Sequence, residues 1–245
     1  MKDIHWNPWH GCTKVSPGCK NCYMFAIDSS HNKQSNKVCK TKQFDLPVRR
    51  DKYCDYVLRE SNDFIYTCLT SDFFHKDADG WRLEAWKMMK ERNDLNFMLF
   101  TKRIDRFMVN LPVDWGRGYD NVYVAVSCEN QRYVDERVSE LVTLPIKHRI
   151  IALSPLLECV SVGKWLDTRK IEHVSVSGES SAYEARVLDY DWVLKVRQEC
   201  LEHQTGFNFR QTGSLFLKDG RLYRLNIHKL QIEQAIKAGI DIGDG

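Results

Sequence analysis

Three closely spaced cysteines near the start of the chain restrict its fold and chemistry more than any other feature. Cys12, Cys19 and Cys22 form a C-x6-C-x2-C pattern in which glycine and proline residues favour turns between the thiols. A Cys-x-x-Cys pair on a turn directs two sulfurs at one centre, and a third thiolate slightly upstream can join them. Three thiolates suit either a tetrahedral zinc ion with one open position or a four-iron cluster with one unligated iron. We therefore expect a metal centre whose open position binds a substrate or cofactor.

The length and charge of the chain set broad limits. With 245 residues it can form one large or two small domains, and α/β barrels of this length are common. Its net charge of +3 neither requires nor excludes a nucleic-acid partner. No stretch has the length of a membrane span, and the start lacks the apolar core of a signal peptide. We therefore expect no association with a membrane and a cytoplasmic location, where thiols stay reduced.

The other cysteines fall into two groups. The total of nine is odd, which argues against a disulfide framework. Either Cys39 or Cys54 could supply a fourth metal ligand. The remaining four lie in apolar segments and are expected to be small core residues: Cys68, Cys128, Cys159 and Cys200.

Short apolar segments alternate with amphipathic ones along the chain, which is typical of an α/β fold. Each apolar segment is rich in β-branched or aromatic residues and ends in polar residues, as buried parallel strands do. Together with a short first strand around Ile4–Trp9, about six to seven strands are expected, the others being Phe64–Leu69, Asn96–Phe100, Val122–Val126, Arg149–Leu153, His173–Ser177 and Phe207–Phe209.

Helices are expected between these strands, with Pro145 ending one of them and Asp189 as the N-cap of another. Because strands and helices alternate, we expect βαβ units and a parallel sheet. In a parallel α/β barrel the active site lies at the carboxyl ends of the strands, which is where the polar residues fall. The inward-facing residues follow the helical period: Trp81, Ala85, Met88 and Met89; Val134, Val138, Leu141 and Val142; Trp192, Val193, Val196 and Cys200.

The segment Asn7–Tyr23, NPWHGCTKVSPGCKNCY, resembles the signature of the three-Cys-motif proteins of phages and bacteria, which are regarded as relatives of the radical S-adenosylmethionine (SAM) enzymes. Radical SAM enzymes usually have the spacing C-x3-C-x2-C and often an aromatic residue before the last cysteine, where this chain has Asn21. The resemblance covers residues 3 to about 214 and continues, in order, through Thr70–His75, Leu99–Arg103, Val126–Gln131, Ser154–Leu157, Ser177–Ser180 and Phe209–Gly213.

The resemblance implies a partial (β/α) barrel of the radical SAM type with a [4Fe-4S] cluster on Cys12, Cys19 and Cys22. The unligated iron would chelate SAM, and one electron from the cluster would cleave SAM to give the 5′-deoxyadenosyl radical that abstracts hydrogen from a substrate. A reductant such as flavodoxin or ferredoxin would supply the electron, and a partner protein is compatible with this chemistry. The barrel would span residues 1–214, with residues 215–245 forming a hairpin and a helix packed on the same domain.

The resemblance also implies residues that bind SAM. In radical SAM barrels the loop after the second strand holds the amino group, which points to Ser71 and Asp72. The end of the fourth strand meets the ribose, which points to Ser127, Glu129 and Asn130, since an ammonium and a diol both need acceptors. The alternative for each residue is a helix N-cap or a loop hydrogen bond after a strand.

Two further strand ends carry candidate cofactor-binding residues. Lys102 and Arg103 could bind the SAM carboxylate or a substrate phosphate, or could form salt bridges between strand ends. Ser177 and Glu179 lie in a tight turn that could expose backbone amides and one carboxylate to the cofactor.

The substrate is expected to be anionic. The segment Asn32–Lys52 is rich in lysine and arginine and has no helical period, so it is expected to be a loop or lid beside the cluster. It is either solvated surface, as such basic runs usually are, or the place where a phosphate backbone or another anionic substrate docks. Arg103, Arg210 and Gln211 are the candidate substrate contacts, although barrel closure is an alternative role for the last two. A nucleic acid or a nucleotide is therefore the expected substrate class.

The sequence thus predicts a radical SAM-like enzyme whose reaction it does not name. One alternative is a zinc-binding module in which the three cysteines and His10 support a nucleic-acid-binding surface without catalysis. A second is a cluster-bearing protein that does not cleave SAM and serves a partner as a redox or scaffold subunit.

Overall fold

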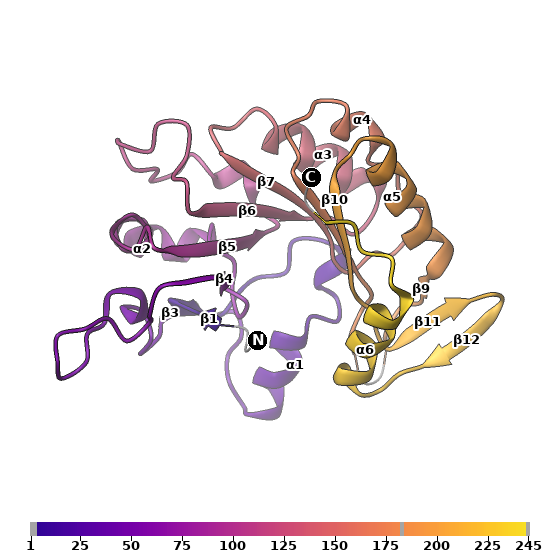
Figure 1. The fold of residues 1–245 in the computed structure, drawn as a ribbon. Helices are drawn as coiled ribbons and strands as arrows, with labels where there is room; N and C mark the ends of the chain where they lie inside the picture. Colours follow the sequence, from indigo (N-terminus) through magenta and orange to yellow (C-terminus); the bar gives the residue numbers. More distant parts are fainter. Residues whose placement is uncertain (1–3, 182–183, 244–245) are drawn as a thin grey trace. The chain divides into compact units, whose positions relative to one another are not determined.

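The structure is a computed structural model that describes residues 4–181 and 184–243. Its main feature is a seven-stranded sheet whose strands follow one another in sequence order (Figure 1). Within this sheet the pairs with a described register are parallel, namely β1–β4, β4–β5, β7–β8 and β8–β10. This order is that of a partial (β/α) barrel, which confirms the expected fold class. The strands are β1 (Ile4–Trp6), β4 (Ser61–Thr67), β5 (Leu95–Thr101), β6 (Val122–Ser127), β7 (His148–Leu153), β8 (His173–Ser177) and β10 (Gly206–Gln211).

The expected helices are present between the strands. They are α2 (Asp79–Glu91), α3 (Gln131–Leu141) and α5 (Tyr190–Glu202). Asp189 caps α5 as expected, because its side chain accepts a hydrogen bond from the Asp191 N–H. The shorter helices and 3₁₀ turns are η1 (Pro17–Cys19), α1 (Tyr23–Ser30), η2 (Leu46–Val48), η3 (Lys76–Ala78), η4 (Ile104–Arg106) and α4 (Gly163–Leu166).

The C-terminal part follows the expected plan of a hairpin and a helix. The hairpin pairs β11 (Leu215–Lys218) with β12 (Arg221–Arg224). Asp219 and Gly220, the two residues between these strands, both have positive φ, as the tight turns of two-residue hairpins require. Helix α6 (His228–Ala238) follows, and the two-residue strand β9 (Leu188–Asp189) pairs with β11.

Two local expectations are corrected. The first strand does not run through Ile4–Trp9: it stops at Trp6, and Trp9–His10 forms the separate strand β2, paired with β3 (Cys39–Lys40). Pro8, which lacks an N–H, separates the two strands. Cys159, expected in the core, is exposed because it lies in a loop after β7 and not in a strand or helix.

By its internal contacts the chain forms two compact units, each assembled from separate stretches. The first contains the residues up to Thr13, Ile27–Ala125 and Leu144–His148. The second contains Lys14–Ala26, Val126–Thr143 and the chain from Arg149 onward. The division falls within β6, between Ala125 and Val126. It does not coincide with the sequence boundary expected at residue 214.

The core of the first unit is aromatic. The rings of Trp9, Phe73 and Trp86 are in contact, with centroid distances of 5.2 Å and 4.6 Å for successive pairs. Trp86 also contacts Trp115, which in turn contacts Phe107. All five side chains are buried, so this cluster fixes the loop that follows β4.

Aliphatic residues dominate the core of the second unit. Val134, Val138 and Leu141 of α3 and Val193 and Val196 of α5 are fully buried, as their helical spacing predicts.

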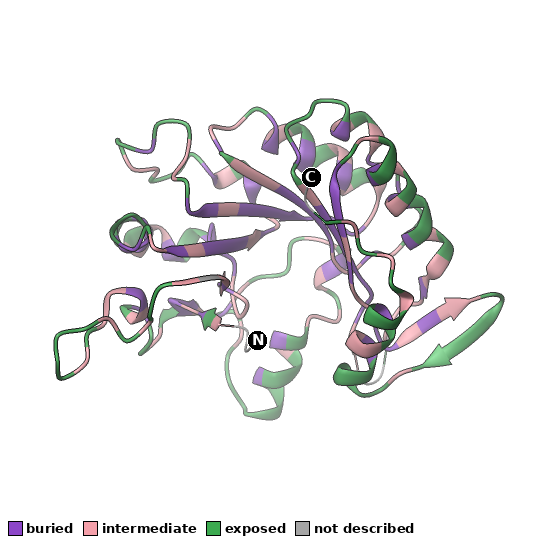
Figure 2. Ribbon diagram, viewed as in Figure 1, coloured by how far each residue is buried: buried purple, intermediate pink, exposed green. Residues whose placement is uncertain are grey.

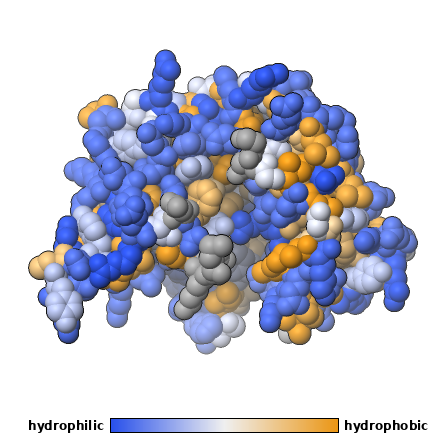
Figure 3. Space-filling model, in the orientation of Figure 1, coloured by the Kyte–Doolittle hydropathy of each residue, from blue (hydrophilic) through white to orange (hydrophobic). Residues whose placement is uncertain are grey.

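Buried residues lie along the strands of the sheet, whereas β12 is exposed along its whole length (Figure 2). The face drawn in Figure 3 is mostly hydrophilic, with smaller hydrophobic groups among the polar side chains. Within residues 4–181 and 184–243 no helix has the length and apolar character needed to cross a membrane.

Candidate functional site

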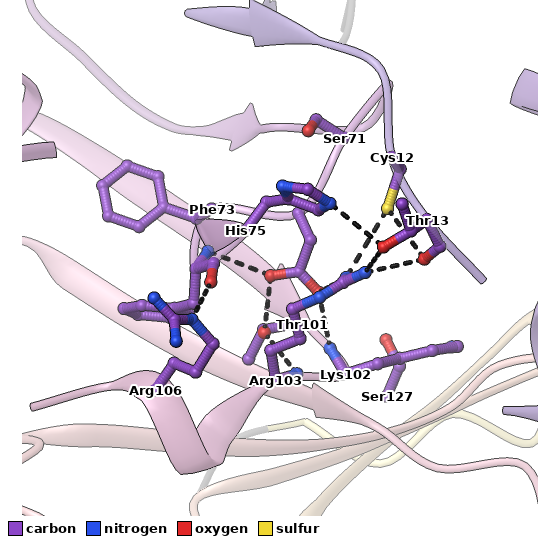
Figure 4. A network of polar contacts seen from close by, with 12 residues as sticks. Cys12, Thr13, Ser71, Phe73, His75, Thr101, Lys102, Arg103, Arg106 and Ser127 are labelled. Atoms are coloured by element: carbon purple, nitrogen blue, oxygen red, sulfur yellow. Dashed lines mark hydrogen bonds and ion pairs between the residues drawn. The ribbon is translucent and has the colours of Figure 1, made fainter. Parts of the chain in front are cut away.

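In the first unit, Arg103 connects the end of β5 to the cysteine segment (Figure 4). Its Nη1 donates to the Cys12 Sγ at 3.5 Å and to the Asp72 Oδ2 at 3.0 Å. Its Nη2 donates to the backbone carbonyl of Thr13 at 2.6 Å and to the Thr13 Oγ1 at 2.9 Å. One buried guanidinium therefore holds the backbone and the thiol of the segment that carries the first cysteine.

Asp72 orients this guanidinium from the loop after β4. Its Oδ1 accepts from the Phe74 N–H at 3.0 Å and from the Thr101 hydroxyl at 2.8 Å. Its Oδ2 accepts from the Lys102 N–H and from Arg103, both at 3.0 Å. Four donors occupy both oxygens, which is the ordinary capacity of a carboxylate. In this structure Asp72 thus ties the ends of β4 and β5 together and fixes Arg103.

Two further arginines hold the loop that carries Asp72. Arg82 of α2 donates to the carbonyls of Phe73 and His75, at 3.0 Å and 2.9 Å. Arg106 donates to the carbonyl of Phe74 at 3.0 Å. Because guanidinium groups bind three successive carbonyls, buried and partly buried arginines fix the Asp72 loop together with the aromatic cluster.

The electrostatics of this cluster follow from burial and charge. Burial alone would lower the pKa of Arg103, but the interactions with Asp72 and Cys12 more than offset it and raise that pKa. Burial, reinforced by Arg103, lowers the pKa of His75, which accepts a hydrogen bond from the Asp77 N–H and contacts Thr13 Oγ1 at 3.1 Å. Arg103 is therefore firmly cationic, and His75 is held as the neutral imidazole.

The basic segment runs beside the strand that leads to Cys12. The Cys12 N–H donates to the Ser35 carbonyl at 2.8 Å, and β2 pairs antiparallel with β3 through His10 and Cys39. At Gly11, φ is +98° and a Cβ would lie 2.4 Å from the Lys37 carbonyl oxygen, so this close approach requires glycine. Ser35 and Lys37 thus lie beside Cys12 and Gly11, and the segment 32–52 contains β3 and η2 as well as loop.

In the second unit, Glu129 at the end of β6 binds the turn that carries Cys19. Its Oε1 accepts from the Gly18 N–H at 3.1 Å, and its Oε2 is paired with Arg137 of α3 at 3.0 Å. The side chain of Glu129 is 0% exposed. A buried carboxylate is costly unless it is paired and hydrogen-bonded, and here both conditions are met.

Glu179, after β8, binds the residue that precedes Cys22. Its Oε2 accepts from the Asn21 side chain at 3.0 Å and from the Arg186 N–H and Nε, each at 3.0 Å. Arg186 also donates to the carbonyl of Pro17 at 3.0 Å. Burial raises the pKa of Glu179, but the hydrogen bonds from Arg186 and Asn21 prevail, so the net shift is downward and the group is a carboxylate.

The other predicted site residues have mainly local partners. Asn130 caps α3 by accepting from the Tyr133 N–H, which is the alternative role considered for it. The Ser71 hydroxyl donates to the Gly11 carbonyl at 2.5 Å. Ser127 and Ser177 are buried, and the Ser177 hydroxyl donates to Ser154. Three more candidates are half-buried at strand ends: Lys102, Arg210 and Gln211, whose amide donates to the Gly178 carbonyl at 3.2 Å.

The cysteines of the motif differ from the core cysteines in exposure. The thiols of Cys12, Cys19 and Cys22 are half-buried. Burial raises the pKa of Cys200 to about 12 and that of Cys68 well above its usual value, which makes both poor ligands and nucleophiles. Cys39 and Cys54 are exposed. In the described part of the chain, no three His, Cys, Asp or Glu side chains form a group ready to hold a metal ion.

Several residues of these networks have no signal in the sequence. Thr13, Arg137 and Arg186 lie outside every strand-end cluster, so only the three-dimensional contacts reveal their roles. Asn21 was visible as a departure from the usual radical SAM pattern, and its contact with Glu179 gives that departure a structural reason.

A comparison with known families finds one match. The sequence model of the family described as "Protein of unknown function (DUF5131)" matches residues 1–237, which is nearly the whole chain. No curated protein and no solved structure matches the chain.

Proposed function

We propose a function for this chain, which belongs to the DUF5131 family of proteins of unknown function: it is a radical SAM-like enzyme. In this proposal Cys12, Cys19 and Cys22 hold a [4Fe-4S] cluster, and SAM is the cosubstrate. The grouping of the three thiols rests on the C-x6-C-x2-C motif.

One observation carries the proposal. The charged residues at the carboxyl ends of the strands are used to hold the cysteine segment. In the first unit Arg103 of the β5 end binds Cys12 and Thr13. In the second unit Glu129 and Glu179 bind residues adjacent to Cys19 and Cys22. A purely structural loop of this size does not need three buried ionic anchors, whereas a cluster-binding loop needs fixed ligands and fixed partners around them.

The donor set fits an iron–sulfur cluster by its chemistry. Thiolates are the ligands that iron–sulfur clusters use, and the three motif thiols are partly exposed. When bound, the cluster would supply the single electron that cleaves the sulfonium of SAM for hydrogen abstraction from a substrate.

The residues of this chain would bind and orient the reactants. Lys102, half-buried at the end of β5, is proposed to bind the SAM carboxylate through its ammonium group. Ser71, Ser127 and Ser177 are proposed to contribute hydroxyl groups to the same cofactor. The carboxylate oxygens of Asp72, Glu129 and Glu179 already accept hydrogen bonds from the protein. These side chains would therefore support the site and not contact SAM themselves.

An anionic substrate such as a nucleic acid or a nucleotide is proposed from the position of the basic segment. Residues 33–42 are hydrogen-bonded to the strand that leads to Cys12, and Lys33, Lys37 and Lys42 are exposed there. Lysines beside the cysteine segment would attract phosphate groups. The proposed contacts of Arg210 and Gln211 with the substrate and the proposed reductant, flavodoxin or ferredoxin, belong to the same hypothesis.

The alternative of a zinc-binding module has one supporting observation. The Nε2 of His10 contacts both oxygens of the buried Asp28, at 2.9 Å and 3.0 Å. Zinc-ligating histidines commonly pair one ring nitrogen with a carboxylate while the other binds the metal. His10 therefore has the kind of carboxylate partner that zinc-ligating histidines commonly have.

The experiment that tests the proposal begins with anaerobic reconstitution. The protein is expected to bind about four irons and four sulfides per chain. The electron paramagnetic resonance signal of the dithionite-reduced protein should change when SAM is added, and 5′-deoxyadenosine should form. The Cys12→Ala, Cys19→Ala and Cys22→Ala variants should lose iron, whereas Cys159→Ala, at an exposed thiol outside the motif, should retain it.

Other outcomes would select an alternative. A colourless protein with one zinc ion, lost in a His10→Ala variant, would establish the zinc-binding module. A four-iron protein would be a scaffold or redox subunit if SAM does not change its electron paramagnetic resonance signal and no 5′-deoxyadenosine is released.

A further inference from the structure

The guanidinium of Arg103 binds both the Asp72 carboxylate and the cysteine segment. Each terminal nitrogen makes two hydrogen bonds: Nη1 binds the Cys12 sulfur and the Asp72 carboxylate, and Nη2 binds two oxygens of Thr13 (Figure 4). A salt bridge between the ends of β4 and β5 needs only the contact with Asp72. The other three hydrogen bonds hold Cys12 and Thr13, so the guanidinium does more than join two strands.

Buried neighbours hold the Arg103 side chain in this position. The side chains of Arg103 and Asp72 are 9% and 6% exposed. The Thr101 hydroxyl accepts from the Arg103 N–H at 2.8 Å and donates to Asp72, which fixes the backbone of Arg103 relative to its carboxylate partner. Buried ion pairs of this kind contribute little net stability, because desolvation of both groups opposes their attraction. A role beyond stability is therefore the better explanation for a buried cation directed at a thiol.

Resting on the proposed function, we propose that Arg103 is a positioning residue that donates a hydrogen bond to the Cys12 sulfur of the bound cluster and raises the reduction potential of the cluster. Hydrogen bonds to the sulfurs and nearby positive charge are among the factors that set the potential of an iron–sulfur cluster. Reduction adds negative charge, so a cation and an N–H donor at a ligating sulfur stabilise the reduced form more than the oxidised form. Asp72 acts through Arg103 by keeping the guanidinium in place.

The test compares cluster-loaded wild-type protein with Arg103→Gln and Arg103→Lys. Arg59→Gln is the matched control, because Arg59 is an exposed arginine of the same unit that pairs with Asp51 and Asp55. Iron per chain is measured first, and the reduced fraction is then followed by electron paramagnetic resonance during a potentiometric titration. Neither readout depends on turnover.

The Arg103→Gln variant is expected to favour the oxidised cluster about tenfold more than wild type does, a change as large as the smaller effects that loss of such a hydrogen-bond partner has on metal affinity or activity. For a one-electron couple this is about 59 mV lower potential. Arg103→Lys retains the positive charge but lacks the planar set of donors of a guanidinium. A smaller decrease in reduction potential is therefore expected. Arg59→Gln should match wild type.

An unchanged potential in Arg103→Gln at full iron content would overturn the inference and leave the proposed function standing. If Arg103→Gln does not retain iron, Arg103→Lys is used instead, and an unchanged potential in that variant overturns the inference. If wild type binds no cluster, the proposed function fails and this inference fails with it.

Discussion

Gly18 donates its backbone N–H to the Oε1 of Glu129 at 3.1 Å, and a side chain in that position would be tightly crowded by the same glutamate. A Cβ at residue 18 would lie 3.0 Å from the Glu129 Cδ and 3.2 Å from its Oε2. Glu129 cannot withdraw easily, since its other oxygen is paired with Arg137. The turn that carries Cys19 is therefore fitted to one buried carboxylate.

We expect a Gly18→Ala substitution to break this fit. The added methyl would push the turn away from Glu129 and weaken the hydrogen bond, with a cost of about 1–3 kcal/mol in the free energy of unfolding. Chemical denaturation measures this cost. Gly80→Ala is the control: nothing lies within 4 Å of a Cβ there, and alanine is the better helix former in α2. A Gly18→Ala protein as stable as wild type would show that the turn is free to move.

The second prediction concerns the buried pair of Asp72 and Arg103. An Asp72→Asn substitution leaves the guanidinium without its counter-charge and replaces an acceptor with a donor facing N–H groups. Loss of one partner of a buried ion pair costs about 3–5 kcal/mol. Urea denaturation should show this loss for Asp72→Asn, whereas Asp105→Asn, at an exposed aspartate nearby, should change stability by less than about 0.5 kcal/mol. Equal effects of the two substitutions would contradict the assigned network.

Thiol exposure gives a third prediction. In metal-free folded protein, alkylation should modify the exposed and half-buried thiols and leave Cys68, Cys128 and Cys200 unmodified until the chain unfolds. Burial and the raised pKa of Cys68 and Cys200 both oppose thiolate formation. Mass spectrometry of the peptides identifies the modified sites.

The same labelling after cluster loading tests the ligand set. Cys12, Cys19 and Cys22 should become protected, while the exposed Cys39 and Cys159 stay reactive. Continued alkylation of all three motif thiols in iron-loaded protein would show that the iron is bound elsewhere.

The fourth prediction is a pH dependence that comes from Glu179. Its pKa in the folded protein is below the ordinary value of 4.5, because the hydrogen bonds from Arg186 and Asn21 outweigh the effect of burial. Between that lowered pKa and 4.5 the unfolded chain binds more protons than the folded one. The contribution of Glu179 to stability is therefore complete above this window and is lost as pH falls through it.

A Glu179→Gln variant should show a smaller loss of stability on acidification than wild type. The free energy of unfolding is measured for both from neutral pH into this acid window. Glu184→Gln is the control, since Glu184 is 69% exposed and its pairing with Lys20 is weak. If Glu179→Gln and wild type lose stability in parallel, the pKa of Glu179 is not lowered by folding.

The strands and helices were largely predictable from local pattern. Val122–Val126 and His173–Ser177 are apolar runs bounded by polar residues, and β6 and β8 match them within one residue. Asp189 was recognisable as an N-cap because its position precedes a clear helical period. Local pattern failed where one residue decides the outcome, as at Pro8, which splits the first strand, and at Cys159, whose apolar neighbours lie in a loop.

The candidate site was predictable in composition but not in its connections. Glu129 and Glu179 could be singled out because both follow predicted strands at the carboxyl ends, where the active site of a barrel lies. Their partners could not, because Gly18 is 111 residues from Glu129 and Asn21 is 158 residues from Glu179. Arg186 has neither a motif nor a period to mark it. Contacts over such separations depend on the register of the whole sheet, which no local pattern contains.

The long separation between the cysteine turn and its anchors has a consequence for the synthesis of the protein. At ribosomal rates of about 5–20 residues per second, the turn that contains Cys19 and Cys22 would leave the ribosome roughly ten to thirty seconds before Glu179 and Arg186 follow. During that interval the Cys19 and Cys22 thiols of the nascent chain lack these anchors and can meet metal ions and oxidants. The turn that carries Cys19 and Cys22 therefore acquires its anchored arrangement late, after most of the chain has been made.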